Sequence, residues 1–580
     1  MLTQRTSGKT SACLLLGVLV TLATACQSGQ GTAGGGPGGP GAEPAGGAPQ
    51  PRVNRLTFGI PPVPTTVTSF ESNNTNFAHS TSYWPMAPMY EFLIGVTAEG
   101  QELVPQLATE WSLDPDGKSY RFKLKKGIPF HYGQGELTAK DVRFSWEDMK
   151  TEPNPSFGGQ KFIVTNQIKD VELVSDQELV IRLADRDAGF LPGISQAENI
   201  FPIGSKADGN SRTRRATLDD KPYAGTGPYR YLERQQGQYL RYERPPGTHW
   251  RQTPDFPEFE FRFIKENSTI LAALLAGETQ VAALPQEMVL QAEQAGLKAI
   301  PGKAAGFHAL LAFFGVWVNQ AITPQMVLNS DPKATFVFPN SPLMDVRVRK
   351  ALNKAIDRDA LNKAFIGGKG QPIYNQYFHS SRPGWNPQWE RNFKEAYGYD
   401  PEAARKLLTE AGYGPGRQLS TTVRLVPSPY FPATLDMDEA IASMWRAVGI
   451  DVKLDQTDPL VAAGKSARGE WDNHSHVVIT SIRQLNGVTV YNGIRSGVRS
   501  GAQLPELNDL FDRIRVTLDQ READGLWRKW GDTAYEQYVN GPLFWLPAYA
   551  TVNPKIVGDY VFPGSISGTF THVEYIKAAP

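Results

Sequence analysis

The first 52 residues differ from the rest of the chain and confine the folded part to residues 53–580. A short basic start precedes an apolar run over residues 13–22, an order that is typical of a secretory signal and too short to cross a bilayer stably as a helix. Residues 27–51 are mostly Gly, Ala, Pro, Ser and Gln, with almost no apolar side chains to bury. We therefore expect a signal peptide over residues 1–25, a solvated tether over residues 26–52, and folding outside the cytoplasm.

Residues 22–26 read LATAC, which places a cysteine directly after small residues. The segment resembles the bacterial lipobox, in which the thiol is acylated and becomes the first residue of the mature protein. It departs from that pattern at Ala23, where the family usually has Leu. The resemblance implies that Cys26 carries a lipid that holds the chain on the outer face of the cell membrane. The alternative is signal cleavage nearby, with Cys26 as a bystander.

Composition excludes several classes of function. The chain has 59 basic and 59 acidic residues, and loss of residues 1–25, which hold two bases and no acid, leaves a net charge of −2. This balance argues against nucleic acid as a partner, because phosphate binding needs a basic face. The only cysteines are Cys13 and Cys26, so the folded part has no disulfide, cysteine-based zinc site or cysteine nucleophile.

About 530 residues come after the tether, which is enough for two or three domains. Alternating apolar residues predict strands over residues 120–124, 179–183 and 259–263. Residues 229–244, with Gly237 near the middle, predict a β-hairpin. Strands and helices are mixed along the whole chain, so we expect an α/β protein of more than one lobe.

Helices are predicted where capping residues precede apolar residues at helical spacing. The predicted starts are Thr138 with Asp141, Asn267, and Asp400 with Pro401, and helical spacing between Asp345 and Gly367 predicts a further helical stretch. The helix after Asn267 should stop at Gly277, and the helix after Asp400 at Gly412.

Four blocks in family order carry a resemblance: LVPQLATEW at 103–111 with DGKSYRFKL, GIPFH and LTAKDV up to residue 142; GTGPY at 225–229; DVRVRKALNKAIDR at 345–358; and DPEAARKLL at 400–408. Together they resemble the family 5 extracellular solute-binding proteins of ABC importers, the oligopeptide-, dipeptide- and nickel-binding group. Each block also has a structural interpretation. Trp111 and Phe122 are expected in the core, residues 225–228 form a turn without the glycine spacing of a dinucleotide loop, and Asp357-Arg358 is a solvated or capping pair.

The resemblance implies a periplasmic-binding-protein clamp of class II, with two lobes that close on a ligand like a Venus flytrap. Lobe I would comprise residues 53–305 and the returning residues 545–580, with an extra subdomain at about residues 80–220. Lobe II would comprise residues 306–544.

Peptide-binding members of this family resemble one another in a late segment whose acid pairs with the α-amino group of the ligand. The matching stretch here, residues 477–493, contains no acid, and none occurs between Asp472 and Glu506. A buried ammonium without an anion is costly, so we expect a ligand that is neutral or carries an anionic group. Candidate contacts are Arg483 as a fork donor, Gln484, Tyr491 and Asn492. The alternative is that Arg483 lies on the surface and that the loop is misaligned.

Aromatic side chains supply further candidate ligand contacts, since their faces suit sugars, flat organic groups and peptide side chains. They are Tyr83, Trp84 and Tyr90 early in the chain, and Phe544 and Trp545 near the expected return crossing. Glu91 lies outside residues 477–493 and is the acid that could pair with a ligand amine in place of one in that stretch. The alternative is that these aromatic residues belong to the core.

Metal and catalytic sites are not expected. His474 and His476 would share one face of a strand, but no further ligands are apparent nearby, and two exposed histidines are the commoner case. The chain has no Gly-x-Ser-x-Gly elbow for hydrolysis.

We therefore expect a monomeric, extracytoplasmic binding protein without cofactor, metal or catalytic residues. It would capture a small organic ligand, peptide-like, oligosaccharide or related, and deliver it to an ABC permease and its ATPase. Two other interpretations stay open: a ligand-sensing surface lipoprotein without a transport role, and a lipid-anchored hydrolase.

Overall fold

The computed structural model describes residues 51–61, 87–98, 102–151, 164, 167–197, 201–210, 224–235, 237–303, 307–318, 336–376, 378–380, 383–426, 431, 433–458, 461, 465, 469–481, 502–562 and 572–580. Residues 49–580 form one contact unit. In the ranges just given, no helix has both the length and the apolar character of a membrane span. The expected signal peptide and Cys26 lie outside these ranges.

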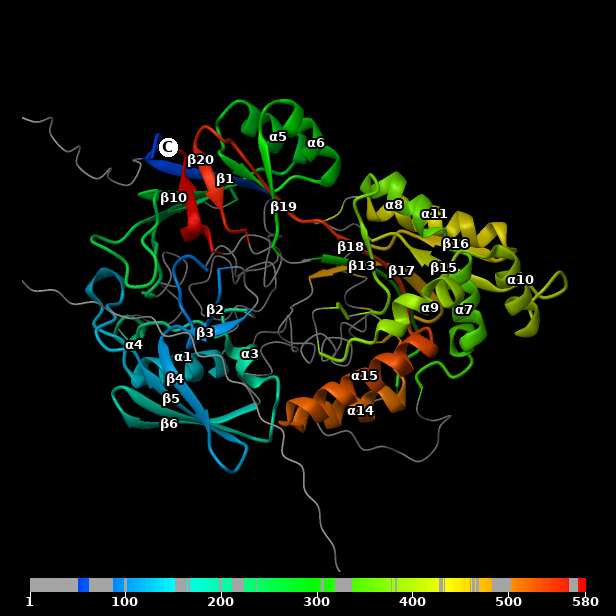
Figure 1. Ribbon diagram of the computed structural model, residues 1–580, viewed down its shortest axis with the longest axis horizontal. Coiled ribbons are helices and arrows are strands. Elements are labelled where there is room, and N and C mark those ends of the chain that lie inside the picture. The colour runs from blue at the N-terminus through cyan, green and yellow to red at the C-terminus, as the bar shows by residue number, and fades with distance from the viewer. Residues whose placement is uncertain are drawn as a thin grey trace, which may run out of the picture. The chain divides into compact units, whose positions relative to one another are not determined.

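The first sheet has seven strands and gathers segments from both ends of the chain (Figure 1). Its order is β12 (Lys298–Pro301), β19 (Tyr549–Val552), β11 (Val281–Ala282), β1 (Arg55–Ile60), β10 (Glu258–Phe263), β9 (Tyr239–Glu243) and β8 (Arg230–Gln235). β1 is parallel to β10 and β11, and the other pairs are antiparallel. Phe259 and Phe261 are fully enclosed and meet edge to face, with ring centroids 4.6 Å apart. The predicted hairpin is confirmed as β8 and β9.

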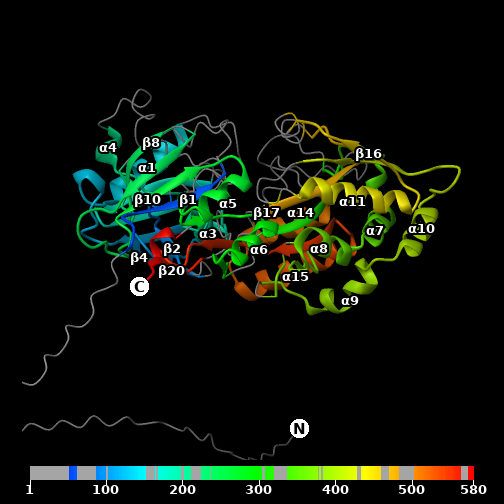
Figure 2. The ribbon, with the colours of Figure 1, turned by 90° about the horizontal axis from the view of Figure 1, so that it is seen from above.

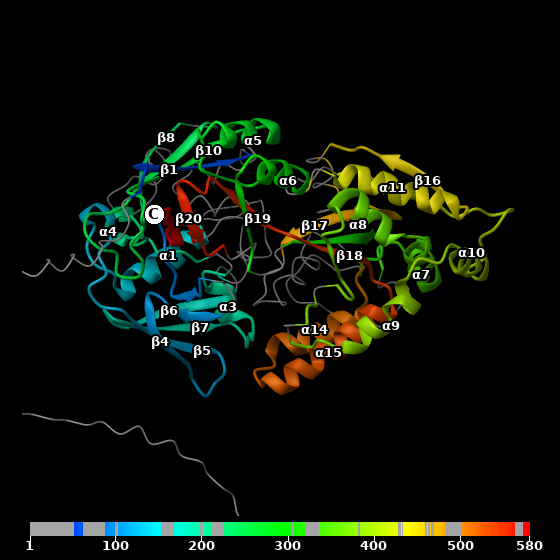
Figure 3. The same cartoon turned by 45° about the horizontal axis from the view of Figure 1, so that its top comes forward.

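Two helices pack against this sheet (Figure 3). α5 (Asn267–Leu275) contacts β1 and β11, and α6 (Gln286–Gln294) contacts β12 and β19. The predicted stop of α5 at Gly277 is confirmed, since this residue has a φ of 76° that favours glycine. The predicted cap is wrong: Glu266 occupies the N-cap position, and no side chain there accepts a helical N–H.

A second, antiparallel sheet has the order β4 (Ala108–Leu113), β5 (Ser119–Leu124), β7 (Glu178–Leu183) and β6 (Ile168–Ser175). The predicted alternation holds, because Phe122 and Ile181 are fully enclosed on one face. α1 (Ala139–Thr151) packs against β6 and begins with the predicted capping box, in which the Thr138 N–H donates to Asp141 Oδ2 at 2.9 Å. The shorter elements nearby are β2 (Ile94–Val96), β3 (Leu103–Pro105), α3 (Phe190–Ile194) and α4 (Lys206–Asn210).

A six-stranded sheet forms from the second half of the chain. Its order is β14 (Gln371–Pro372), β18 (Asn540–Leu546), β13 (Phe307–Phe314), β17 (His474–Ser481), β15 (Ser420–Arg424) and β16 (Asp451–Asp455). β13 is antiparallel to both neighbours, and β15 is parallel to both of its neighbours. The chain then returns to the first sheet through β19 and ends with the pair β20 (Val557–Tyr560) and β21 (Ile576–Ala578).

The helices of this region are α7 (Val346–Lys354), α8 (Arg358–Ile366), α9 (Pro387–Tyr397), α10 (Pro401–Glu410), α11 (Thr434–Ala447), α14 (Pro505–Val516) and α15 (Gln520–Glu536). α11 lies along β15, β16 and β17 (Figure 2), and α8 contacts β18. The side chains of Asp345, Asp357 and Asp400 each accept a backbone N–H of the first turn. The capping role of Asp357 and the helix start at Asp400 are as the sequence predicts.

The expectation that Arg358 is a solvated or capping residue is wrong. Its guanidinium is buried and donates to the carbonyl oxygens of Asn353, Tyr397 and Pro542, and to Asn353 Oδ1. It thereby links the ends of α7 and α9 to β18. Burial without a carboxylate lowers the pKa of Arg358 to about 10, so the side chain stays charged at neutral pH.

A second buried arginine, Arg251, connects segments from the first half and from the end of the chain. Arg251 donates to Glu91 Oε1 at 2.8 Å and to Glu574 Oε1 at 2.6 Å, and both carboxylates are almost fully enclosed. Burial acts to lower the pKa of Arg251, but Glu574 and Glu91 outweigh it and raise the pKa above its ordinary value. Three segments that are far apart in sequence thus meet at one cation.

Replacing Arg251 with Met should lower the free energy of unfolding by about 3–5 kcal/mol, because two carboxylates are then buried without a cation. Glu91→Gln is the comparison variant: Arg251 keeps Glu574 and one amide oxygen still accepts, but the NH2 group replaces an oxygen that accepts from Arg251 or from Thr226 and Trp250. We expect a smaller loss for this variant, because no carboxylate is left without its cation. Chemical denaturation followed by tryptophan fluorescence measures both, and equal losses would contradict the proposed role of the cation.

Candidate functional site

Most of the expected ligand contacts fall outside the described residues and stay predictions. These are Tyr83, Trp84, Arg483, Gln484, Tyr491 and Asn492, and the lipidation candidate Cys26 is also outside. The candidates that the structure describes are Tyr90, Glu91, Phe544 and Trp545.

Tyr90 and Glu91 are both enclosed in the first part of the chain. Tyr90 belongs to the core of the seven-stranded sheet. Beyond its ion pair with Arg251, Glu91 accepts hydrogen bonds at Oε2 from the Thr226 hydroxyl at 3.0 Å and from the Trp250 ring N–H at 3.1 Å. Burial raises the pKa of Glu91, and Arg251 partly offsets that rise. We do not propose Glu91 as an acid for a ligand amine, because both of its oxygens already bind protein groups.

The turn at residues 225–228 holds Thr226 against Glu91 by close backbone approach. The Gly227 N–H donates to the Met89 carbonyl at 2.9 Å. A Cβ on Gly227 would lie 2.4 Å from the Pro88 carbonyl oxygen, so only glycine fits beside this stretch of backbone. The glycines of the GTGPY block therefore serve packing, as the sequence predicts.

Gly227→Ala should lower the free energy of unfolding by about 1–3 kcal/mol or more, because the new methyl group would clash with rigid backbone. Gly525→Ala is a suitable control, since Gly525 lies in α15 with open space around it. The control should gain about 0.5–1 kcal/mol from helix propensity. Thermal unfolding distinguishes the two, and a neutral Gly227→Ala variant would rule out the close approach.

Phe544 and Trp545 lie next to each other in β18 and point to opposite faces of the six-stranded sheet. Phe544 joins the core beneath α8 and α11. Trp545 packs with Leu310 and Ile373 on the other face, where the rings of His308 and His379 have centroids 5.9 and 5.4 Å from its own. Of these two candidates, only Trp545 faces away from the helices.

The face that Trp545 shares continues across β13 and β17 as an aromatic surface. Phe314 and Trp317 meet edge to face, and together with Trp471 they form a separate buried cluster. His476 stacks on Phe314, with centroids 4.8 Å apart. We call this group, Phe314, Trp317, Trp471 and His476, the aromatic cluster.

Arg424, at the end of β15, is the residue of this surface that sequence reasoning missed. Its guanidinium carbon lies 3.9 Å from the centroid of the Trp471 ring, and 5.5 Å from that of Phe314. Burial lowers its pKa to about 10, although the fields of Asp455 and Asp438 act to raise it. The signal in the sequence that could have pointed to Arg424 is a single basic residue within the mostly apolar run TVRLV at residues 422–426.

The two histidines that share a strand face do not form an exposed pair, so that expectation is wrong. His476 is buried, which lowers its pKa well below the ordinary value and keeps it neutral, and His474 is half-buried. Among the described residues, no group of three or more His, Cys, Asp or Glu side chains could hold a metal ion.

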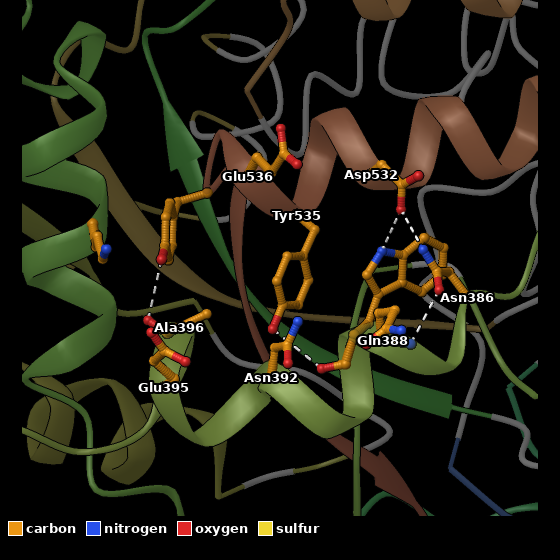
Figure 4. A pocket seen from close by; sticks show the side chains of 11 residues that line it. Asn386, Gln388, Asn392, Glu395, Ala396, Asp532, Tyr535 and Glu536 are labelled. Carbon is orange, nitrogen blue, oxygen red and sulfur yellow. Dashed lines mark hydrogen bonds between the residues drawn. The ribbon is translucent and has the colours of Figure 1, made fainter.

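A pocket of about 560 Å³ lies elsewhere, among α7, α9 and α15 (Figure 4). Asp532 accepts hydrogen bonds there from the Asn386 amide and the Trp389 ring N–H, both at 2.8 Å. Tyr535 donates to the Trp389 carbonyl. None of the expected ligand residues lines this pocket, and its best donors and acceptors are engaged in holding α9 to α15.

The family model for bacterial extracellular solute-binding proteins, family 5, matches residues 102–482, which is more than half of the chain. The chain belongs to this family. The resemblance drawn from the four sequence blocks is therefore confirmed. The dipeptide-binding protein of Escherichia coli K12 is 29% identical over 391 residues, which cover 63% of this chain and 66% of that protein. The chain spans slightly less than two thirds of the length of the first curated relatives that it matches.

Solved structures of other proteins share the fold over almost the whole chain. The DppA protein of Helicobacter pylori, in complex with the peptide STSA, has a TM-score of 0.70 at 21% identity and covers 91% of this chain and 98% of its own. NikA of Brucella suis, in complex with Fe(III)-EDTA, has a TM-score of 0.72 at 20% identity, with 90% and 99% covered. The expected α/β fold of a two-lobed periplasmic binding protein is thus confirmed.

Proposed function

We propose that this chain is the extracytoplasmic solute-binding component of an ABC importer. It captures a small organic ligand by closure of two lobes and delivers it to a permease with its ATPase, without making or breaking a bond. Membership of family 5 is the observation that carries this proposal.

The arrangement of strands supports a clamp of two lobes, but it moves the expected boundary at residue 545 to after β18, because Trp545 and Leu546 pair with β13 in the six-stranded sheet. The seven-stranded and six-stranded sheets each have their own buried core. The chain passes from one to the other after β12, and it returns between Leu546 at the end of β18 and Tyr549 at the start of β19. Because the chain passes between the two lobes through few, short segments, the lobes can move as rigid bodies about a hinge.

The ligand that we propose is neutral or anionic. The absence of Asp and Glu between Asp472 and Glu506 argues against recognition of a free amino group in that stretch. Relatives with the same fold bind chemically different ligands, including a peptide and the polycarboxylate chelate Fe(III)-EDTA. The scaffold therefore leaves the ligand to be set by residues particular to each chain.

Native mass spectrometry on the full chain, extracted in mild detergent without added ligand, tests this proposal directly. We expect a discrete mass excess that disappears on denaturation. The ligand released in this way, returned at 100 times its dissociation constant, should raise the free energy of unfolding by about 2.7 kcal/mol. It should also reduce the radius of gyration in small-angle scattering, because closure brings the lobes together. Binding without compaction would contradict capture by lobe closure.

We also propose that Cys26 is acylated and that the chain is a monomer tethered to the membrane by residues 26–52. Cys26→Ser should move the protein from the membrane fraction to the soluble fraction, because the remaining tether has almost no apolar surface to bind lipid. Cys13→Ser serves as the control and should leave fractionation unchanged. A Cys26→Ser protein that stays in the membrane fraction would refute lipidation.

A further inference from the structure

Arg424 is a buried cation without a hydrogen-bond partner for two of its nitrogens. Its side chain is only 3% exposed, and Nε and Nη1 have no acceptor. No ion pair joins it to any described residue. This distinguishes it from Arg251, which binds two carboxylates, and from Arg358, which donates to four oxygens.

Further polar groups without partners surround the end of β15. Asp438 on α11 is fully enclosed, and its Oδ1 accepts from the Val477 N–H at 2.7 Å, while Oδ2 has no donor. Ser475 Oγ and His476 Nδ1 are likewise buried without a partner. Arg424 and His476 face the aromatic cluster, whereas Ser475 and Asp438 lie on the opposite, helix-covered face of the sheet, with Val423 and Val477.

Arg424 lies at the carboxyl end of β15, a position in the sheet where α/β proteins commonly bind ligands. β15 and β17 are parallel, and their pairing ends at Val423 opposite Ser475, while β17 continues to Ser481. Asp438 takes the Val477 N–H that a longer β15 would have paired. The crevice beyond the carboxyl end of a parallel strand, where neighbouring chains diverge, is the usual ligand position in open α/β sheets.

We propose that Arg424 binds a carboxylate group of the captured ligand through its free N–H groups, against the face of Trp471. This inference rests on the proposed function and specifies its ligand class as a small organic carboxylate. The guanidinium carbon lies 3.9 Å from the centroid of the Trp471 ring, and a guanidinium suits a planar anion because its N–H donors form a rigid fork. Trp317 and Phe314 are enclosed and pack with Trp471 in one buried cluster.

Other charged groups near Arg424 are compatible with an anion. Burial raises the pKa of Asp438 well above its ordinary value, and the Val477 N–H and the field of Arg424 act to lower it. Lys465 Nζ lies 4.7 Å from the centroid of the Trp471 ring and adds a second positive charge. Asp455 accepts from the Thr457 hydroxyl, and Asp472 keeps one buried oxygen without a partner. The Arg424 guanidinium carries a positive charge and has two buried N–H groups without an acceptor.

The test uses the full chain in mild detergent and two probes, N-acetyl-Met-Leu and its C-terminal amide, with isothermal titration calorimetry. We expect the wild type to bind the acid at least tenfold more tightly than the amide. Arg424→Met should remove that preference and leave the affinity for the amide unchanged. Arg417→Met, at an exposed position near the same sheet, is the control and should retain the preference.

Thermal unfolding without ligand separates binding from a structural role. Removal of an unpartnered buried charge should leave the melting temperature unchanged or raise it. A melting temperature that falls with Arg424→Met and recovers with Arg424→Lys would overturn the inference, and so would equal binding of acid and amide by the wild type. A wild type that binds neither probe would also overturn the inference, whereas a discrete ligand mass in native mass spectrometry would leave the proposed capture of a small organic ligand standing.

Discussion

Buried arginines join segments of this chain that are far apart in sequence. Arg251 brings together Glu91 from the first part of the chain and Glu574 from its last residues, and Arg358 holds the ends of two helices against β18. A guanidinium suits this task because its five donors lie in a fixed plane and it does not lose its proton at neutral pH. The rest of each core can pack only where these donors find their acceptors, so the two cations restrict how each region can fold.

Much of the fold could be predicted from local pattern, because its elements obey local rules. The alternation around Phe122 and Phe261 corresponds to strands with those rings enclosed, and Asp357 and Asp400 cap helices. The rules failed where tertiary contacts decided the outcome. Arg358 directly follows a capping residue and looks solvated in sequence, yet its acceptors come from residues up to 184 positions away.

The candidate site was less predictable for the same reason. Phe544 and Trp545 are indistinguishable in sequence, and only the pleat of β18 sends one into the helix-covered core and the other to the opposite face. Glu91 is attractive as a free acid until folding brings Arg251, Thr226 and Trp250 against it. The four family blocks did not predict the residues of the candidate site, because their glycines and arginines stabilise the scaffold.

Arg424 differs from the other two arginines in a way that connects stability to function. Arg251 and Arg358 have their acceptors within the protein, so their burial adds no bias toward any ligand. A buried guanidinium with unused donors costs folding free energy, and whatever supplies the missing acceptor recovers that cost. A ligand shifts a clamp toward closure only by the difference in its interactions with the open and closed states. Arg424 and Trp471 both belong to the region of the six-stranded sheet, so their contact with a carboxylate contributes to recognition, and closure requires further contacts from the other lobe.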